Sequence, residues 1–209
     1  TKEEDVVEHL LTCSTHANLL FFTNAGKVYQ VRAYEIPEGT RVSKGKAIFN
    51  FLSLNQQEQV TSVLAVPKVA KGKREGAAFV VMLTKDGIIK KVEALSFDNV
   101  RRSGLISITL KKEDSLRWAK LTGGQDELVL VTKKGQSVRF SEKDVRAMGR
   151  QAAGVRALRL KNGDEVVGMD VMKNSKLKTQ NVPIIPRTLE GKAIGAKLLV
   201  VMENGYGKH

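Results

Sequence analysis

The chain repeats one pattern of hydrophobic and polar positions. A hydrophobic run, a short polar stretch ending in glycine and a second strand-like run with basic residues occur at 19–32, 79–92 and 127–140, and the pattern begins again at 198–209. Two such runs around a glycine turn are typical of a β-hairpin, because glycine accepts the positive φ that the turn needs. The shared glycines recur at roughly 50 to 70 residues, which favours one sheet per repeat over a helical heptad.

Each repeat has two further strand-like segments. A second glycine follows each hairpin and is followed by a segment that alternates between apolar and polar residues, as a half-buried strand does. These segments lie at 48–52, 106–110 and 155–160. Apolar closing strands follow at 60–66, 116–121 and 166–171. We therefore predict an all-β, propeller-like fold of repeated four-stranded blades, with only short helical turns at 34–39 and 140–148.

The repeats give the domain organisation. We predict one domain or fragment over 1–209. Its repeats span approximately 5–66, 77–121, 126–171 and, in part, 196–209, and a basic loop is inserted at 173–197. The chain starts without Met, so we expect it to be a piece of a longer protein.

The charge balance points to a polyanionic partner. Thirty-five basic residues face 22 acidic ones, for a formal charge of +13 and a pI near 9.9. Such an excess is typical of proteins that bind nucleic acid, although a merely solvated basic surface is the alternative. Aromatic residues are only 5% of the chain, so the stacking platforms of single-strand or RNA binders are scarce.

Basic residues also recur in phase with the repeats, beside the hairpin glycine and around the second glycine. If these positions lie on the outer edge of each blade, they form a belt that contacts phosphates without reading sequence. The alternative is that lysines and arginines protect exposed strand edges from aggregation. The candidate DNA-binding residues are Lys27, Arg32, Arg41, Lys44, Lys46, Lys90, Lys91, Arg101, Arg102, Arg139, Arg146, Arg150, Arg156 and Lys208.

Residues for catalysis or metal binding are few. The chain has three His and one Cys, and it has no phosphate-binding loop, nucleophile elbow or zinc-protease motif. We predict no catalytic residue and no metal site, and we expect Cys13 to be a small buried residue. A single cysteine favours a reducing, cytoplasmic location. No apolar run reaches the length of a membrane span.

Three stretches, at 29–52, 145–171 and 200–208, resemble the C-terminal domain of the A subunit of bacterial DNA gyrase. The resemblance implies a β-pinwheel in which adjacent blades exchange a strand and double-stranded DNA wraps around a basic outer rim. It also implies a non-catalytic module of an ATP-dependent type II topoisomerase that introduces negative supercoils. ATP and Mg²⁺ would then belong to other domains, and no cofactor is expected in this one. The expected partners are DNA, the rest of the gyrase A chain and the gyrase B chain, at the nucleoid in the bacterial cytoplasm.

Two departures and two alternatives accompany this resemblance. The family's Gln-Arg-Arg-Gly-Gly-Lys-Gly heptapeptide, the gyrase box, does not occur, and the nearest string is TRVSKGKA at 40–47. The family disc commonly has six blades, whereas this chain supplies three and part of a fourth, so we expect an open arc. The similar domain of topoisomerase IV remains an alternative, as does a propeller that serves as a protein-interaction platform.

Overall fold

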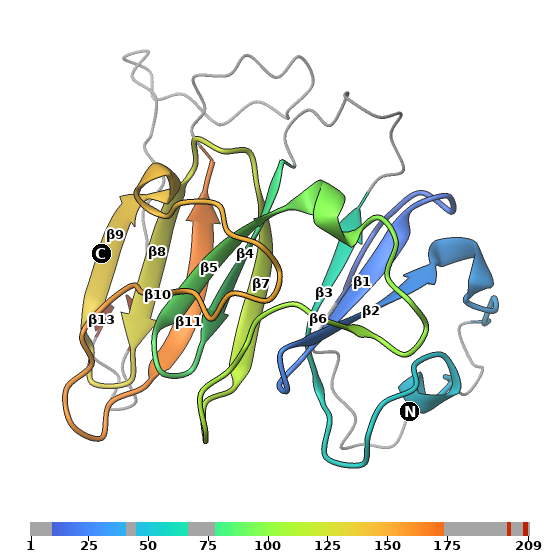
Figure 1. Cartoon of the computed structure of the whole chain (residues 1–209), viewed down its shortest axis with the longest axis horizontal. Helices are drawn as coiled ribbons and strands as arrows, with labels where there is room; N and C mark the ends of the chain where they lie inside the picture. Colours follow the sequence, from blue (N-terminus) through green and yellow to red (C-terminus); the bar gives the residue numbers. More distant parts are fainter. Residues whose placement is uncertain (1–9, 41–44, 67–77, 174–199, 202–206, 209) are drawn as a thin grey trace.

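Three antiparallel sheets follow one another along the chain, one for each full repeat (Figure 1). They belong to a computed structural model that describes residues 10–40, 45–66, 78–173, 200–201 and 207–208. Each sheet is built on a predicted hairpin, and the three hairpins are confirmed. The hairpin strands are β1 (Asn18–Thr23) with β2 (Lys27–Arg32), β4 (Phe79–Thr84) with β5 (Ile88–Glu93), and β8 (Glu127–Thr132) with β9 (Ser137–Ser141).

The predicted closing strands are also confirmed. They are β3 (Val60–Val66), β7 (Leu116–Thr122) and β11 (Val166–Met172), and each pairs antiparallel with the first strand of its own hairpin. We call the three sheets blades 1, 2 and 3. All-β architecture follows for the described residues, in which the only helices are short 3₁₀ turns.

The outermost strand of a blade comes from the next repeat. The two-residue strand β6 (Leu105–Ile106) pairs with β2 in blade 1, and β10 (Val155–Arg156) pairs with β5 in blade 2. Adjacent blades therefore exchange a strand. In the described part of the chain, blade 3 has the three strands β11, β8 and β9.

The alternating segments form much less strand than the sequence predicted. Those at 106–110 and 155–160 contribute only to two-residue ladders, because the chain there crosses from one blade to the next. In the first crossing, Ile106 is 52% exposed while Ile108 is buried between the blades. Residues 48–52, also predicted as a strand, begin with the 3₁₀ turn η2 (Ile48–Asn50), since no described blade lies before blade 1 to accept them.

Other short turns follow the second hairpin strand of each repeat. They are η1 (Ala33–Glu35), η3 (Ala94–Phe97) and η4 (Glu142–Asp144), so turns are found in both places where the sequence predicted them. Cys13, expected in the core, is exposed. It lies in the segment before β1, outside the sheets, where no packed neighbour encloses it.

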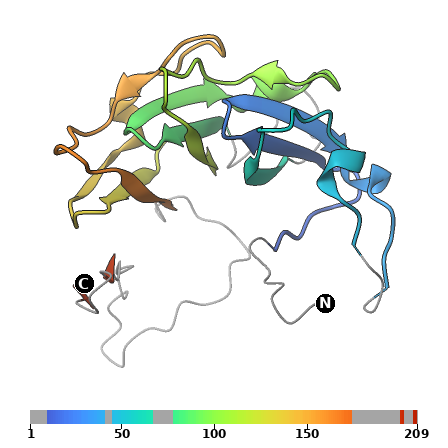
Figure 2. The same ribbon diagram turned by 90° about the horizontal axis from the view of Figure 1, so that it is seen from below.

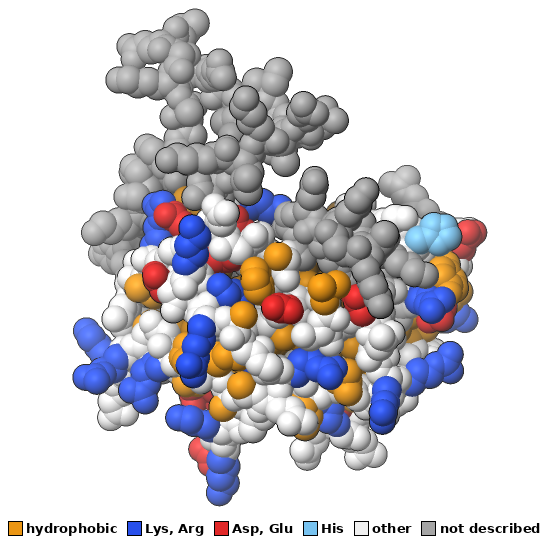
Figure 3. Space-filling model, turned by 45° about the horizontal axis from the view of Figure 1, so that its top comes forward, with side chains coloured by type: hydrophobic (Ala, Val, Ile, Leu, Met, Phe, Trp, Pro, Cys, Tyr) orange, Lys and Arg blue, Asp and Glu red, His pale blue; other side chains and the backbone are white. Residues whose placement is uncertain are grey.

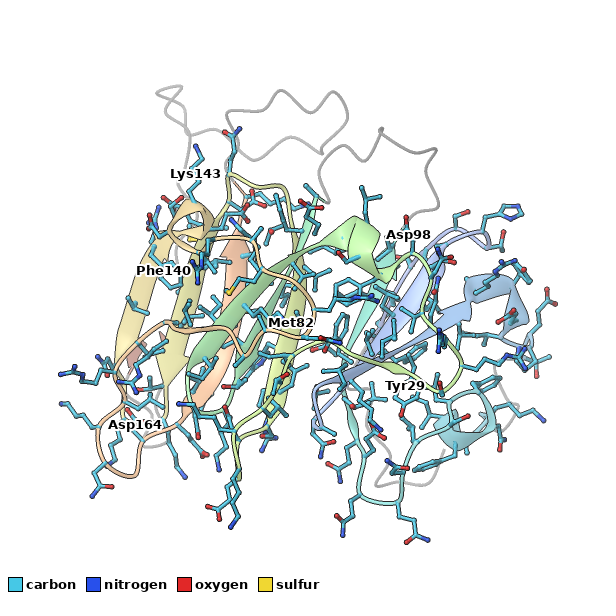
Figure 4. All side chains as sticks on the ribbon, in the orientation of Figure 1. Tyr29, Met82, Asp98, Phe140, Lys143 and Asp164 are labelled. Atoms are coloured by element: carbon cyan, nitrogen blue, oxygen red, sulfur yellow. The ribbon has the colours of Figure 1, made fainter. Side chains whose placement is uncertain are left out.

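The hydrophobic core lies between the blades. One cluster joins blade 1 to blade 2 and includes Leu20, Phe22 and Met82, and a second joins blade 2 to blade 3 around Leu83 and Leu128. Figure 4 labels Tyr29, Met82 and Phe140, one from each blade. Burying each large apolar side chain stabilises the fold by about 1.5–3 kcal/mol, so a blade cannot be stable without its neighbour. Blade 2 is covered on both faces, and five of the six residues of β4 are buried.

The blades are arranged along an arc (Figure 2). The closing strands β3, β7 and β11 contact one another in succession on the concave side. The crossing segments and the exchanged strands β6 and β10 lie on the convex side. Beyond blade 3, β12 (Val200–Val201) pairs with β13 (Gly207–Lys208). None of the helices in the described ranges has the length and apolar character that a membrane crossing requires.

Candidate nucleic-acid interface

The convex edge carries basic side chains from successive repeats. We call the stretches 98–106 and 145–156 the rim segments, because each crosses from one blade to the next on the outside of the arc (Figure 2). Arg101 and Arg102 lie in the first, and Arg146, Arg150 and Arg156 lie in the second. All are exposed except Arg150, which is half-buried. In the space-filling view, Lys and Arg side chains are spread along the face from one end of the arc to the other (Figure 3).

Three of the predicted arginines share one polar hollow. Arg32, at the end of β2, lies beside Arg101 and Arg102 of the first rim segment, although the two segments belong to different repeats. The rim segment is fixed there because the Val100 N–H donates to Gln30 Oε1 over 3.0 Å. Strand exchange thus brings together guanidinium groups that the sequence separates.

The Arg32 guanidinium is oriented by an aromatic neighbour. Its Nη1 donates to the Tyr34 hydroxyl over 2.6 Å, and its Cζ lies 5.8 Å from the centre of the Tyr34 ring. The hydrogen bond to Tyr34 raises the pKa of Arg32 above its ordinary value. A planar, permanently charged fork held in this way suits bidentate contact with a phosphate.

The charge of Lys27, the first residue of β2, is partly neutralised by a carboxylate. Its Nζ lies 3.7 Å from Glu58, which is buried and also accepts hydrogen bonds from the Thr23 and Tyr29 hydroxyls and the Asn55 N–H. Desolvation opposes the charge on Glu58, but these hydrogen bonds and Lys27 outweigh it and lower the pKa of Glu58. Burial and the bond to Glu58 raise the pKa of Tyr29 to about 12. Lys27 therefore stabilises the charge of a buried carboxylate in blade 1, besides adding positive charge to the surface.

A second hollow opens on blade 2, between the loop that precedes β7 and the exchanged strand β10. Lys111 and Arg156 line it, with Ile88 and Gly154 among the other lining residues. Gly154 has φ of +89°, and a Cβ there would lie 2.7 Å from the carbonyl oxygen of Ile89. Only glycine lets the second rim segment approach β5 this closely.

The sequence-based candidate set missed the basic residues that follow each exchanged strand. Lys111, Lys112, Arg159 and Lys161 are exposed on the loops before β7 and β11. A signal for them was present, since LKKEDSL (110–116) and LKNGDEV (160–166) occupy equivalent positions in two repeats. Their phase matches that of the predicted belt, and Lys111 shares a hollow with Arg156.

Two of the predicted contacts are wrong. Lys90 is fully buried and Lys91 is 6% exposed, so neither can reach a phosphate. Lys91 Nζ donates to the carbonyl of Glu142 over 2.7 Å and lies 5.0 Å from the centre of the Phe79 ring. Burial lowers the pKa of Lys90 to about 8. Both lysines point inwards because neighbouring chain covers β5 on both faces, which period-two alternation cannot reveal.

Arg139 and Lys46 lie apart from the two hollows. Arg139, on β9, is exposed but forms an ion pair with Glu127 across the hairpin, which offsets its charge. Lys46 is exposed beside η2, at the end of the arc formed by blade 1. Arg41 and Lys44 lie outside the described residues, and only the backbone of Lys208 is described.

Acidic and sulfur ligands do not gather on this surface. Across the ranges that the structure describes, no group of three or more His, Cys, Asp or Glu side chains could hold a metal ion. Around the two hollows, guanidinium and ammonium groups outnumber the carboxylates, which are Glu35 and Asp98 in the first hollow and Asp114 in the second. Guanidinium and ammonium groups recognise phosphates by charge and hydrogen bonding.

Antiparallel blades that exchange their outermost strand and present a basic convex edge define a β-pinwheel of the nucleic-acid-binding kind. The family model of the DNA gyrase C-terminal domain, a β-propeller, matches residues 17–67, 78–122 and 126–171. The chain belongs to this family. Each matched stretch contains the hairpin and closing strand of one blade, in the order 1, 2 and 3, except that the third stops one residue before the end of β11.

Known relatives agree with this assignment. The DNA gyrase A subunit of Staphylococcus aureus is 37% identical over 208 residues, covering all of this chain and 21% of that protein. The chain thus spans about a fifth of the length of the curated relatives it matches. The solved C-terminal domain of DNA topoisomerase IV has a TM-score of 0.67 at 30% identity, and that of DNA gyrase A has 0.59 at 28%. The superpositions cover 76% and 75% of this chain, respectively, and 48% of each solved domain.

Proposed function

We propose that this domain binds double-stranded DNA on its convex rim, without sequence preference, and bends it. One observation carries the proposal: strand exchange places arginines of successive repeats on the same outer edge, at both joints between blades. A row of cations along a convex surface lowers the repulsion between phosphates of a duplex that curves around it.

The chemistry of the rim favours duplex over single-stranded DNA. The charged residues that line the hollows are five cations, Arg32, Arg101, Arg102, Lys111 and Arg156, and three carboxylates, Glu35, Asp98 and Asp114. Aromatic rings are absent from the described lining residues. Single-strand binders use aromatic platforms for successive bases, whereas a duplex exposes mainly phosphates to a flat or convex surface. Contacts of this kind give affinity without sequence specificity.

The domain is, in this proposal, the non-catalytic C-terminal module of a gyrase-type, ATP-dependent type II topoisomerase that introduces negative supercoils. Family membership and the match of the whole chain to the S. aureus gyrase A protein support it. The rest of the gyrase A chain and the gyrase B chain would be its partners in the bacterial cytoplasm. ATP and Mg²⁺ would act in those other parts, and this domain would need no cofactor. The corresponding module of topoisomerase IV remains the second candidate, since a solved domain of that enzyme superposes with a TM-score of 0.67, against 0.59 for the gyrase A domain.

The test is a titration of unrelated duplexes of equal length with this chain at several salt concentrations. Phosphate contacts release counterions, so affinity is expected to fall by about tenfold or more for a few-fold rise in salt, and to be similar for all sequences. Affinity that does not change with salt, or strong preference for one sequence, would contradict the proposal.

A further inference from the structure

We propose that Lys90 is a positioning residue for the DNA-binding rim: its buried ammonium group fixes the second rim segment, which carries Arg150, against blade 2. This inference rests on the proposed DNA-binding function. Lys90 lies in β5, the central strand to which the second rim segment is joined. It was predicted to touch DNA, and the structure gives it a place beneath the surface instead.

The contacts of the Lys90 ammonium group are all with backbone carbonyls. Nζ donates to Ser107 O over 2.7 Å, to Ala152 O over 2.9 Å and to Arg150 O. Two of the three acceptors belong to the second rim segment, and one of them is the carbonyl of Arg150 itself. An ammonium group has three N–H donors, so this set uses all of them.

Lys90 joins the second rim segment to the residue that directly follows the first. Ser107, its third partner, follows the exchanged strand β6 and donates to Gly26 O in blade 1. Thr109 then donates its hydroxyl to Gln151 O over 2.8 Å, which holds the second rim segment a second time. The buried cation therefore joins the second and third repeats directly, and Ser107 continues the connection to Gly26 in the first.

A buried lysine lowers the stability of the fold unless hydrogen bonds compensate for the lost hydration of its ammonium group. Burying an ammonium group removes its hydration, and a core methionine or leucine would avoid that penalty. The carbonyls of Arg150 and Ala152 would then lose the lysine donor, and the loop between β9 and β10 would be held less tightly, by its remaining bonds to Thr109 and to the Lys91 carbonyl. The ammonium group thus converts a polar loop into a rigid support for arginines, which lowers the entropy lost when DNA binds.

Lys91 provides a matched control. It lies in the same strand and is also buried, but its Nζ donates to Glu142 O in η4 and not to the carbonyls that Lys90 holds. Replacing either lysine by methionine removes one buried charge and keeps a side chain of similar length. The two variants differ in which loop loses its donor.

The first experiment measures amide hydrogen exchange of the free chain. We expect Lys90→Met to raise exchange across 149–154, including the Ala152 amide that bonds to Gly149 O, by about tenfold, and Lys91→Met to leave this segment unchanged. Unchanged exchange in a folded Lys90→Met protein, or an equal rise in both variants, would overturn the proposal. Because no DNA is present, this result is independent of the proposed function.

The second experiment adds a duplex probe of arbitrary sequence, about 40 base pairs long, which is enough to follow the rim at 3.4 Å per base pair. Lys90→Met is expected to weaken binding several-fold at an unchanged salt slope, since no phosphate contact is removed, whereas Lys91→Met should bind as the parent does. Equal affinities of the two variants would contradict a positioning role. If Lys90→Met does not fold, the ammonium resonance of Lys90 in the unmodified chain gives the answer: it should shift when the duplex saturates the rim, and a signal that does not move would overturn the inference.

Discussion

Ser107 donates both its backbone N–H and its hydroxyl to the carbonyl oxygen of Gly26, each over 2.8 Å. The two residues come from adjacent repeats, and the pair closes the joint between blades 1 and 2. At the next joint the Ala157 N–H donates to Gly87 O over 2.9 Å, without a hydroxyl. The same backbone bond thus recurs at both joints, and at the first the Gly26 carbonyl accepts two more hydrogen bonds, from the Ser107 hydroxyl and from the Ile108 N–H over 3.2 Å.

Removing that hydroxyl is expected to loosen the first joint. Ser107 is fully buried, so Ser107→Ala should lower the free energy of unfolding by about 1 kcal/mol, the usual net value of a buried hydrogen bond. Urea unfolding measures the change. Ser137→Ala, at an exposed position of β9, is the control and should stay within about 0.5 kcal/mol of the parent. Equal effects of the two substitutions would mean that the hydroxyl does not support the joint.

Acid is expected to destabilise blade 1 through Glu58. Its folded pKa lies below the ordinary value of 4.5, so its stabilising contribution is fully present above that value and is lost as the pH falls through the lowered pKa. Glu58→Gln should therefore lower the melting temperature at neutral pH and have less effect in acid below the lowered pKa. Melting curves of both proteins across this range test the sign, and a gap that widens in acid would contradict it.

Gly154→Ala tests the close passage of the second rim segment over β5. The substitution puts a Cβ 2.7 Å from Ile89 O in a residue with φ of +89°, so both strain and collision oppose it. We expect a loss of at least about 1–2 kcal/mol in stability. Gly149→Ala is the matched control, because no atom lies within 4 Å of its added Cβ. Similar unfolding curves for the two variants would show that the segment can move away freely.

The hairpins and closing strands could be predicted because the first strand of each hairpin buries most of its residues and appears in the sequence as a short hydrophobic run, the hairpin runs flank a glycine turn, and apolar closing strands follow. The exchanged strands could not be placed in this way. Leu105 and Ile106 form only two ladder pairs, and their partner β2 lies in another repeat, so no local pattern identifies it. The family resemblance, and not periodicity, supplied the expectation of strand exchange, which the structure confirms.

Of the predicted rim residues, several are exposed as expected and two are buried, while their contact with DNA stays a prediction. Arg101, Arg102 and Arg156 are exposed at the joints, where repetition of charge in the sequence had placed them. Lys90 and Lys91 have the same polar signature, yet the covering of β5 by neighbouring chain turns both inwards. Whether a lysine on a central strand faces solvent depends on which repeats pack beside it, and this information lies outside its own segment.

We expect this domain to bend DNA but not to wrap it chirally. Bending a short duplex costs on the order of a few kcal/mol, which phosphate contacts at two joints can offset, whereas a full turn needs contacts around a larger arc. The chain also lacks the gyrase box. Circular DNA relaxed by an added topoisomerase in the presence of the domain should therefore keep nearly the same linking number. A large directional shift at a low ratio of protein to DNA would show that the box is dispensable here.

The most direct test of the account is the salt dependence of duplex affinity after charge reversal on the rim. Arg102→Glu and Arg156→Glu remove exposed charges at the two joints, and Arg117→Glu makes the same change on β7, at the concave side. If the rim contacts phosphates, the double rim variant should bind more weakly, and its plot of log affinity against log salt should be shallower by about two units at an unchanged melting temperature. Arg117→Glu should retain the parent's slope. Equal slopes for the parent, the rim variant and the Arg117 variant would contradict the central claim that DNA binds on the convex edge.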